Sequence, residues 1–187
     1  DPRALLQRAA EAWKTTGLCD RVVIGQTCEV LLLKSLSCEQ AAWQSHVRVT
    51  PLDAMHDWNS IAGIPRPDDA KGEYLDGSNK TWVESTQRPD LATYCGEVLQ
   101  HLLDVGIVVE HAASSDVAFG HCRFQLGATD PTQAADWHLL TCEVIRSTAQ
   151  RYGLIACFLP VVAPALPCVG WNVRLTASKG NESIIAG

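Results

Sequence analysis

One carboxylate stands alone in a strand-like segment, where it needs a partner. Glu29 lies within Gly25–Leu31 and is the only charged residue of that segment. Because side chains alternate between the two faces of a strand, Glu29 shares a face with Thr27. A carboxylate in such a place must be paired with a cation, a metal ion or a hydrogen-bond donor. Glu29 is therefore the first candidate for site chemistry.

A second segment, residues 116–125, also carries polar groups on an apolar background. Asp116 precedes a predicted strand that projects His121 and Arg123 to one side. Carboxylate and imidazole groups are metal ligands, whereas a guanidinium pairs with carboxylates. Two interpretations stay open: a cation site, or a structural ion pair between Glu29 and Arg123 or another base.

Two helical clusters have ligand-like spacing. His138 and Cys142 stand at i and i+4, so both side chains could face one metal ion. Nothing near them in sequence completes a site, and a surface histidine over a buried cysteine is the preferred interpretation. Glu97, His101 and Asp104 share a helical face in the same way, and we interpret them as a solvated face.

Composition and missing motifs exclude several function classes. Hydrophobic residues make up 47% of the chain, charged residues 19%, and the net charge is −6. This composition can bury a core, and an acidic chain without a basic cluster is not typical of proteins that bind nucleic acid or anionic membranes. The chain contains no phosphate-binding GxxxxGK[ST] loop and no complete dinucleotide fingerprint. None of its cysteines lies in a recognisable nucleophile motif.

The cysteine pattern predicts thiols rather than disulfides. The chain has eight cysteines, and no two of them form a CxxC pair. Several lie in apolar runs, where cysteine behaves as a small hydrophobic residue. We expect them to be mostly reduced and buried, which fits a cytoplasmic protein. The uncharged run Leu154–Val173 contains three prolines, so we expect no membrane-spanning helix.

These side chains must be positioned by an α+β or α/β arrangement, because long helices and strands are interspersed. We expect Leu139, Leu140, Ile145 and Ala149 to point inward from the last helix. Residues 34–87 carry turn signals and are expected to form loops with short elements. The predicted helices are 1–17, 88–106 and 134–152, and the predicted strands are 21–33, 107–110, 118–126 and 154–159.

The order of segments resembles the catalytic domain of the glutamine synthetase family. The match runs in order through most of the chain and is weakest over residues 34–71. Each motif alone is modest, but their order and spacing together are fairly specific. Asp1-Pro2-Arg3 with Gly25–Leu32 resembles the family's "DPR…GxExEFFL", and residues 72–76 resemble "GGYFD". Residues 88–110 resemble a helix followed by a "GI.VE" strand, and residues 116–127 resemble "EVxPGQxEFQVG". Residues 135–160 resemble "AD…K…A…G..ATFMPKP", and residues 168–175 fall where the family has "GSGMHxH".

The resemblance implies a fold and an activity. The fold would be a mainly antiparallel sheet with flanking helices, forming one incomplete segment of the catalytic domain over 1–187. The activity would be that of an ATP-dependent ligase, in which Mg²⁺ or Mn²⁺ ions assist phosphoryl transfer to a small carboxylate before ammonia or an amine displaces phosphate. Family members form oligomers, so a homo-oligomer or the remainder of a larger chain is the expected partner.

The metal-ligand positions of the family are altered in this sequence. By the resemblance, Glu29 is kept, Asp116 replaces a glutamate and His121 replaces a glutamine. These three residues are the tentative metal ligands. The other departures are Thr27 and Arg123 for glutamates, Asn172 and Arg174 for the two histidines of "MHxH", and Val161 for a lysine.

Arg123 is the most consequential departure, because a guanidinium stays protonated and cannot ligate a metal ion. It would repel a dication, or replace the charge of that ion by pairing with Glu29 or Asp116. Three functions stay open: a pseudoenzyme or scaffold, a diverged carbon–nitrogen ligase with one remaining cation, and a nucleotide- or anion-binding module in which Arg123 and Arg174 hold phosphate.

Overall fold

One antiparallel sheet organises the chain. The computed structural model describes residues 1–41, 44–52, 91–114, 120–160, 169–180 and 182–184. All described strands join this sheet, and every pair of neighbours in it is antiparallel. The main order is β3-β4-β1-β6-β7, with β2 and β5 also paired to β1. The strands are β1 (Arg21–Ala41), β2 (Gln44–Pro51), β3 (Val109–Ser114), β4 (His121–Thr129), β5 (Ile155–Cys157), β6 (Trp171–Lys179) and β7 (Glu182–Ser183).

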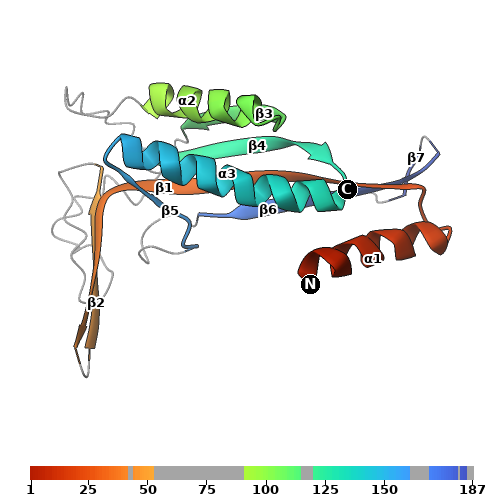
Figure 1. The fold of residues 1–187 in the computed structure, drawn as a ribbon, viewed down its shortest axis with the longest axis horizontal. Helices are drawn as coiled ribbons and strands as arrows, with labels where there is room; N and C mark the ends of the chain where they lie inside the picture. Colours follow the sequence, from red (N-terminus) through yellow and green to blue (C-terminus); the bar gives the residue numbers. More distant parts are fainter. Residues whose placement is uncertain (42–43, 53–90, 115–119, 161–168, 181, 185–187) are drawn as a thin grey trace, which may run out of the picture.

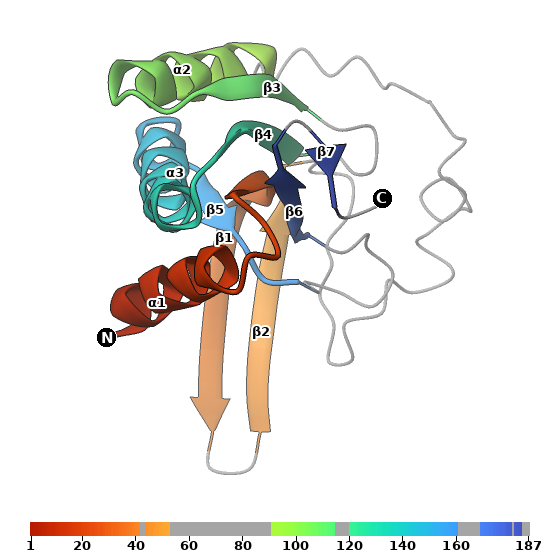
Figure 2. The ribbon, with the colours of Figure 1, turned by 90° about the vertical axis from the view of Figure 1, so that its right-hand side faces the viewer.

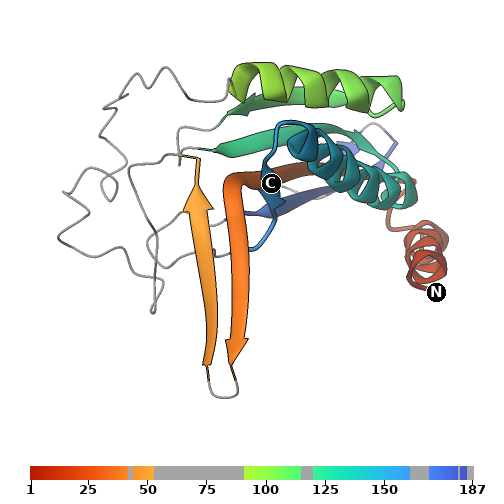
Figure 3. The ribbon, with the colours of Figure 1, turned by 60° about the vertical axis from the view of Figure 1, so that its left-hand side comes forward.

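The central strand β1 is longer than its sequence predicts. The expected strand ends at residue 33, but β1 continues to Ala41 and pairs there with β2. The register shifts between Leu33 and Ser35, and beyond this point the β1–β2 hairpin projects from the rest of the sheet (Figures 1 and 3). The expectation of loops with short elements over 34–87 was therefore wrong for 34–41, which continue the long strand β1, whereas β2 is one short element of that stretch. Polar and apolar residues alternate over 35–39 and 46–50, so the sequence does carry a short strand pattern that the prediction did not use.

Helices cover one face of the sheet. They are α1 (Pro2–Thr15), α2 (Leu91–Asp104) and α3 (Pro131–Arg151), and Figure 2 shows all three on the same side of β1 and β4. The Asp1 side chain caps α1 and that of Asp130 caps α3, each by accepting backbone N–H groups. The main core between α2, α3 and the sheet includes Val30, Leu32, Tyr94, Val98, Leu102, Phe124, Leu126, Ile145 and Ala149.

The inward face of α3 differs in part from the prediction. Ile145 and Ala149 are buried as expected, but Leu139 is 70% exposed and Leu140 48% exposed. The buried stripe of α3 follows Ala134, Trp137, Thr141, Ile145 and Thr148, at steps of three or four residues. The two leucines fall outside that stripe. None of the described helices is long and apolar enough to cross a membrane.

Candidate functional site

Glu29 lies at the centre of the sheet, on the face turned away from α2 and α3. It sits opposite Arg123 of β4, and its backbone N–H donates to the carbonyl of Gly170 at 3.0 Å. The neighbouring residues Cys28 and Val30 belong to the core beneath the helices. Strand alternation therefore directs Glu29 to the opposite face, although its side chain is only 8% exposed.

Both carboxylate oxygens of Glu29 are engaged by protein donors. Arg123 donates from Nε to Oε1 at 2.9 Å, and its Nη2 lies 2.8 Å from the same oxygen. The backbone N–H of Gly170 donates to Oε2 at 3.0 Å. The ion pair with Arg123, which was one of the two interpretations of the sequence, is confirmed. The charge of Glu29 is neutralised by a guanidinium.

His121 lies beside this ion pair without a close hydrogen bond to it. Its Nε2 is 3.6 Å from Oε2 of Glu29, and the residue is 2% exposed. Neither ring nitrogen has a hydrogen-bond partner within the described part of the chain. Burial lowers the pKa of His121, and the charge of Arg123 lowers it further, while Glu29 acts in the opposite direction. The ring is therefore neutral near pH 7.

The remaining positions of the expected metal site hold groups that suit a metal ion poorly. Thr27 and Gly25 of β1 pair with Asn172 and Arg174 of the neighbouring strand β6, respectively. The Arg174 side chain lies over Gly25, with Nη2 3.6 Å from the place of a Cβ at that glycine. Hydroxyl, amide and guanidinium groups replace the carboxylates and imidazoles that hold divalent ions. These groups differ from the carboxylate and imidazole ligands that the resemblance implies at the same positions.

Two expected site residues cannot be placed, and two others lie apart. Asp116 and Val161 fall outside the described residues. Arg123 and Arg174 face positions of β1 that are four residues apart, which is about 13 Å along the strand. They also lie on opposite sides of β1. The structure therefore does not bring these two arginines together around one anion.

The cluster on α2 forms surface ion pairs. Arg151 of α3 bonds to both Glu97 and His101, and Glu97 also lies 3.6 Å from His101. Asp104 accepts a hydrogen bond from Gln100 at 2.8 Å. The side chains of Glu97 and His101 are about one-third exposed. These contacts connect α2 to α3 at the protein surface and agree with a partly solvated face.

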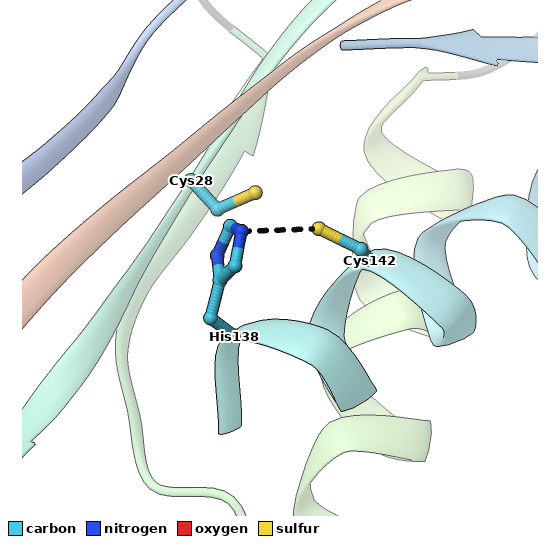
Figure 4. Close-up of side chains that lie close together, drawn as sticks. All are labelled: Cys28, His138 and Cys142. Carbon is cyan, nitrogen blue, oxygen red and sulfur yellow. Dashed lines mark hydrogen bonds between the residues drawn. The ribbon is translucent and has the colours of Figure 1, made fainter. Parts of the chain in front are cut away.

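The helical pair His138 and Cys142 has a third member that sequence spacing does not reveal. Cys28 of β1 lies against both residues, and Figure 4 shows the three side chains converging. Cys142 Sγ is 3.7 Å from His138 Nε2. Hydrogen bonds from Cys28 and His138 lower the pKa of Cys142 to about 5, and the same thiol contact raises that of Cys28. The only sequence signal was that Cys28, as the strand neighbour of Glu29, must point to the opposite face of the sheet. That signal does not identify the residues it contacts there.

Six of the cysteines are free and buried, as expected. They are Cys19, Cys28, Cys95, Cys122, Cys142 and Cys157.

Comparisons with known proteins agree with the segment order. A family model described as "Glutamine synthetase, catalytic domain" matches residues 1–186. The chain is 25% identical to glutamine synthetase of Escherichia coli (strain K12) over 193 residues, covering 100% of this chain and 39% of that protein. It is also 25% identical to glutamine synthetase of Methylococcus capsulatus over 192 residues, with the same coverage. The chain thus spans about two-fifths of these relatives.

Solved structures show the same fold. Glutamine synthetase of Plasmodium falciparum superposes with a TM-score of 0.72 at 21% identity, covering 98% of this chain and 35% of that one. The ligand-free form of GmaS superposes with a TM-score of 0.61 at 18% identity, covering 100% and 37%. Together with the family match over nearly every residue, these similarities place the chain in the glutamine synthetase family, as a diverged segment of its catalytic domain.

Proposed function

We propose that this chain is part of a glutamine synthetase-like protein whose metal-assisted ligase activity is weak or lost, and which serves as a scaffold. The observation that carries the proposal is the Arg123–Glu29 ion pair. It places a permanent cation on the one carboxylate that the resemblance keeps at the metal site.

The charge of Arg123 disfavours a divalent ion at this position. A dication within about 4 Å of a guanidinium is repelled by roughly several kcal/mol before solvent screening. Arg123 is 46% exposed, so screening reduces this repulsion. However, an incoming ion would also have to displace the two donors on Oε1 of Glu29 and the Gly170 N–H on Oε2. Both effects act against binding of Mg²⁺ or Mn²⁺.

The scaffold role rests on what the chain retains. The sheet and its strand pairing bury Glu29 and His121. We take residues 1–187 to belong to one domain. Assembly with further copies or with the rest of a longer chain, in the cytoplasm, would then be its main interaction.

A diverged ligase is the second candidate, and one observation favours it. His121 has two ring nitrogens without hydrogen-bond partners among the described residues, and Nε2 lies 3.6 Å from Glu29 Oε2. Glu29 and His121, with Asp116, would hold one cation in an enzyme that joins another acid to an amine with ATP. For that, Arg123 must move away from Glu29.

A thermal melt of the longest natural chain distinguishes the two candidates. The melt is run with ATP, with Mg²⁺ or Mn²⁺, and with both. A ligand at about one hundred times its Kd stabilises a protein by about 2.7 kcal/mol. The scaffold predicts no shift with any combination. A shift that needs both ATP and metal would establish the ligase-type pocket instead, and a shift with ATP alone would indicate the anion-binding module.

A further inference from the structure

We propose that Cys28, His138 and Cys142 form a binding site for a thiophilic divalent metal ion, namely Zn²⁺. This cysteine–histidine cluster lies between the sheet and α3, on the opposite face of β1 from Glu29 (Figure 4). It is independent of the proposed loss of ligase chemistry.

The distances in the cluster match the dimensions of a zinc site. One ligand atom from each of the three residues lies within 4.8 Å of the other two, and Cys142 Sγ is 3.7 Å from His138 Nε2. With Zn–S bonds of about 2.3 Å and Zn–N bonds of about 2.0 Å, a tetrahedral ion separates S from N by about 3.5 Å and S from S by about 3.8 Å. The ligands therefore need to move by only about 1 Å or less.

The ligand types select the metal. Two thiolates and an imidazole are a preferred set for Zn²⁺, whereas Mg²⁺ and Mn²⁺ prefer oxygen ligands. Cys28 and Cys142 are 2% and 8% exposed, so the sulfur atoms are shielded from solvent. Three protein ligands leave the fourth position of the tetrahedron for a water molecule. In the part of the chain that the structure describes, this is the only such group of three residues.

The imidazole is already held in place. The His138 ring stacks on the Trp171 ring, with centroids 3.9 Å apart and planes 14° from parallel. Trp171 donates from Nε1 to Gln26 Oε1 at 3.1 Å, and Gln26 Nε2 donates to the carbonyl of Ala134 at 2.6 Å. His138 Nδ1 is buried and has no hydrogen-bond partner among the described residues. The ring therefore turns Nε2 toward Cys142 Sγ, while Nδ1 makes no hydrogen bond within the described part of the chain.

A second pair of buried thiols provides a matched control. Cys95 of α2 and Cys122 of β4 are buried in the same core, and each thiol shifts the pKa of the other, but no histidine completes a group of three with them among the described residues. A generic affinity of buried thiols for metal ions would involve both pairs. A specific metal site would bind the ion at the cysteine–histidine cluster and not at Cys95 and Cys122.

A Co²⁺ titration of the longest natural chain, reduced and freed of metal, tests the proposal. We expect one tetrahedral Co²⁺ per chain, with thiolate-to-cobalt charge-transfer absorption, displaced by Zn²⁺. C28S, C142S and H138Q should each weaken binding by more than about 100-fold, because even outer-shell partners of metal ligands contribute about 10- to 100-fold. C95S should bind as the wild type does. Absence of the charge-transfer band, or a band unaffected by C28S and C142S, would overturn the proposal.

Thiol protection in the wild-type protein keeps the test independent of how the variants fold. Alkylation with an iodoacetamide reagent is followed by peptide mass spectrometry, with Zn²⁺ or with a chelator. Zn²⁺ should slow modification of Cys28 and Cys142 at least about tenfold relative to Cys95, as expected when the thiolates become ligands. Equal rates with and without Zn²⁺, or a Cys28–Cys142 disulfide in the freshly purified protein, would contradict the site.

Discussion

At the residue scale, the chemistry of this chain depends on the partner of one buried carboxylate. Glu29 is 8% exposed and accepts from Arg123 and from the Gly170 backbone. A buried carboxylate that loses its cation keeps its desolvation cost without the compensating attraction. Substitutions at Arg123 and His121 therefore report directly on the local charge balance.

Replacing Arg123 by methionine should destabilise the fold. It removes the two contacts to Oε1 and leaves only the Gly170 N–H on the carboxylate. Because Arg123 is 46% exposed and water can partly replace it, we expect a loss of about 1–2 kcal/mol in the free energy of unfolding. Urea denaturation measures this loss. Arg8→Met, at an exposed position of α1, is the matched control and should change stability by less than about 0.5 kcal/mol. Equal effects of the two substitutions would disprove a stabilising role for the ion pair.

His121 should make stability depend on pH. Its pKa is lowered in the folded protein, chiefly by burial, with Arg123 and Glu29 as the charged groups that face it. The unfolded chain therefore binds a proton that the folded chain does not, as pH falls below the ordinary histidine pKa of about 6.5. The contribution is fully present above that pH and is lost as pH falls toward the lower pKa of the folded state. Urea melts between pH 5 and 8 should show a steeper slope for the wild type than for His121→Gln, and identical slopes would contradict this assignment.

At the element scale, helix register and helix ends decide which side chains face the core. The apolar periodicity of α3 and the glycines after α2 and α3 could be read from the sequence, and Gly106 and Gly153 do end them with positive φ. The buried face of α3 could be read only in part, because packing against α2 and the sheet selects the stripe that includes Trp137 and Ile145 and leaves Leu139 and Leu140 outside it. The β1–β2 hairpin was missed although polar and apolar residues alternate over 35–39 and 46–50, because the turn signals farther along 34–87 favoured loops.

The register of α3 predicts opposite outcomes for two apolar residues. Ile145→Ala should cost about 2–5 kcal/mol, because Ile145 is fully buried and its truncation leaves a cavity. Leu139→Gln should change stability by less than about 0.5 kcal/mol, because Leu139 is 70% exposed. Thermal or chemical denaturation compares them. A large loss for Leu139→Gln would indicate that this leucine is covered in solution.

Two glycines distinguish backbone strain from steric crowding. Gly153 has φ +66° and Gly96 lies within α2, and nothing lies within 4 Å of a Cβ added at either position. Gly153→Ala should destabilise by about 1–2 kcal/mol, since an L-residue is strained in the left-handed region. Gly96→Ala should stabilise by about 0.5–1 kcal/mol through lower chain entropy. Destabilisation by both would mean that the Gly153 effect does not arise from φ.

At the scale of the whole molecule, the fold class and the family were visible in the sequence, but the site was visible only in part. The order of motifs indicated a glutamine synthetase catalytic domain, which the match over residues 1–186 confirms. Pairing of Glu29 with Arg123 was one of two open interpretations, and strand register settles it. Cys28 could not be joined to His138 and Cys142, because Cys28 and His138 are 110 positions apart and sequence spacing does not reveal so distant a contact.

The most direct test of the account is a Mn²⁺ titration of the longest natural chain, followed by electron paramagnetic resonance. Mn²⁺ suits oxygen ligands, so it reports on the Glu29 face and not on the cysteine–histidine cluster. If Arg123 has replaced the ion, the wild type binds no Mn²⁺ that depends on Glu29. Arg123→Glu would then gain such a site, and adding Glu29→Gln to that variant would abolish it. Binding of Mn²⁺ by the wild type that Glu29→Gln removes would contradict the account.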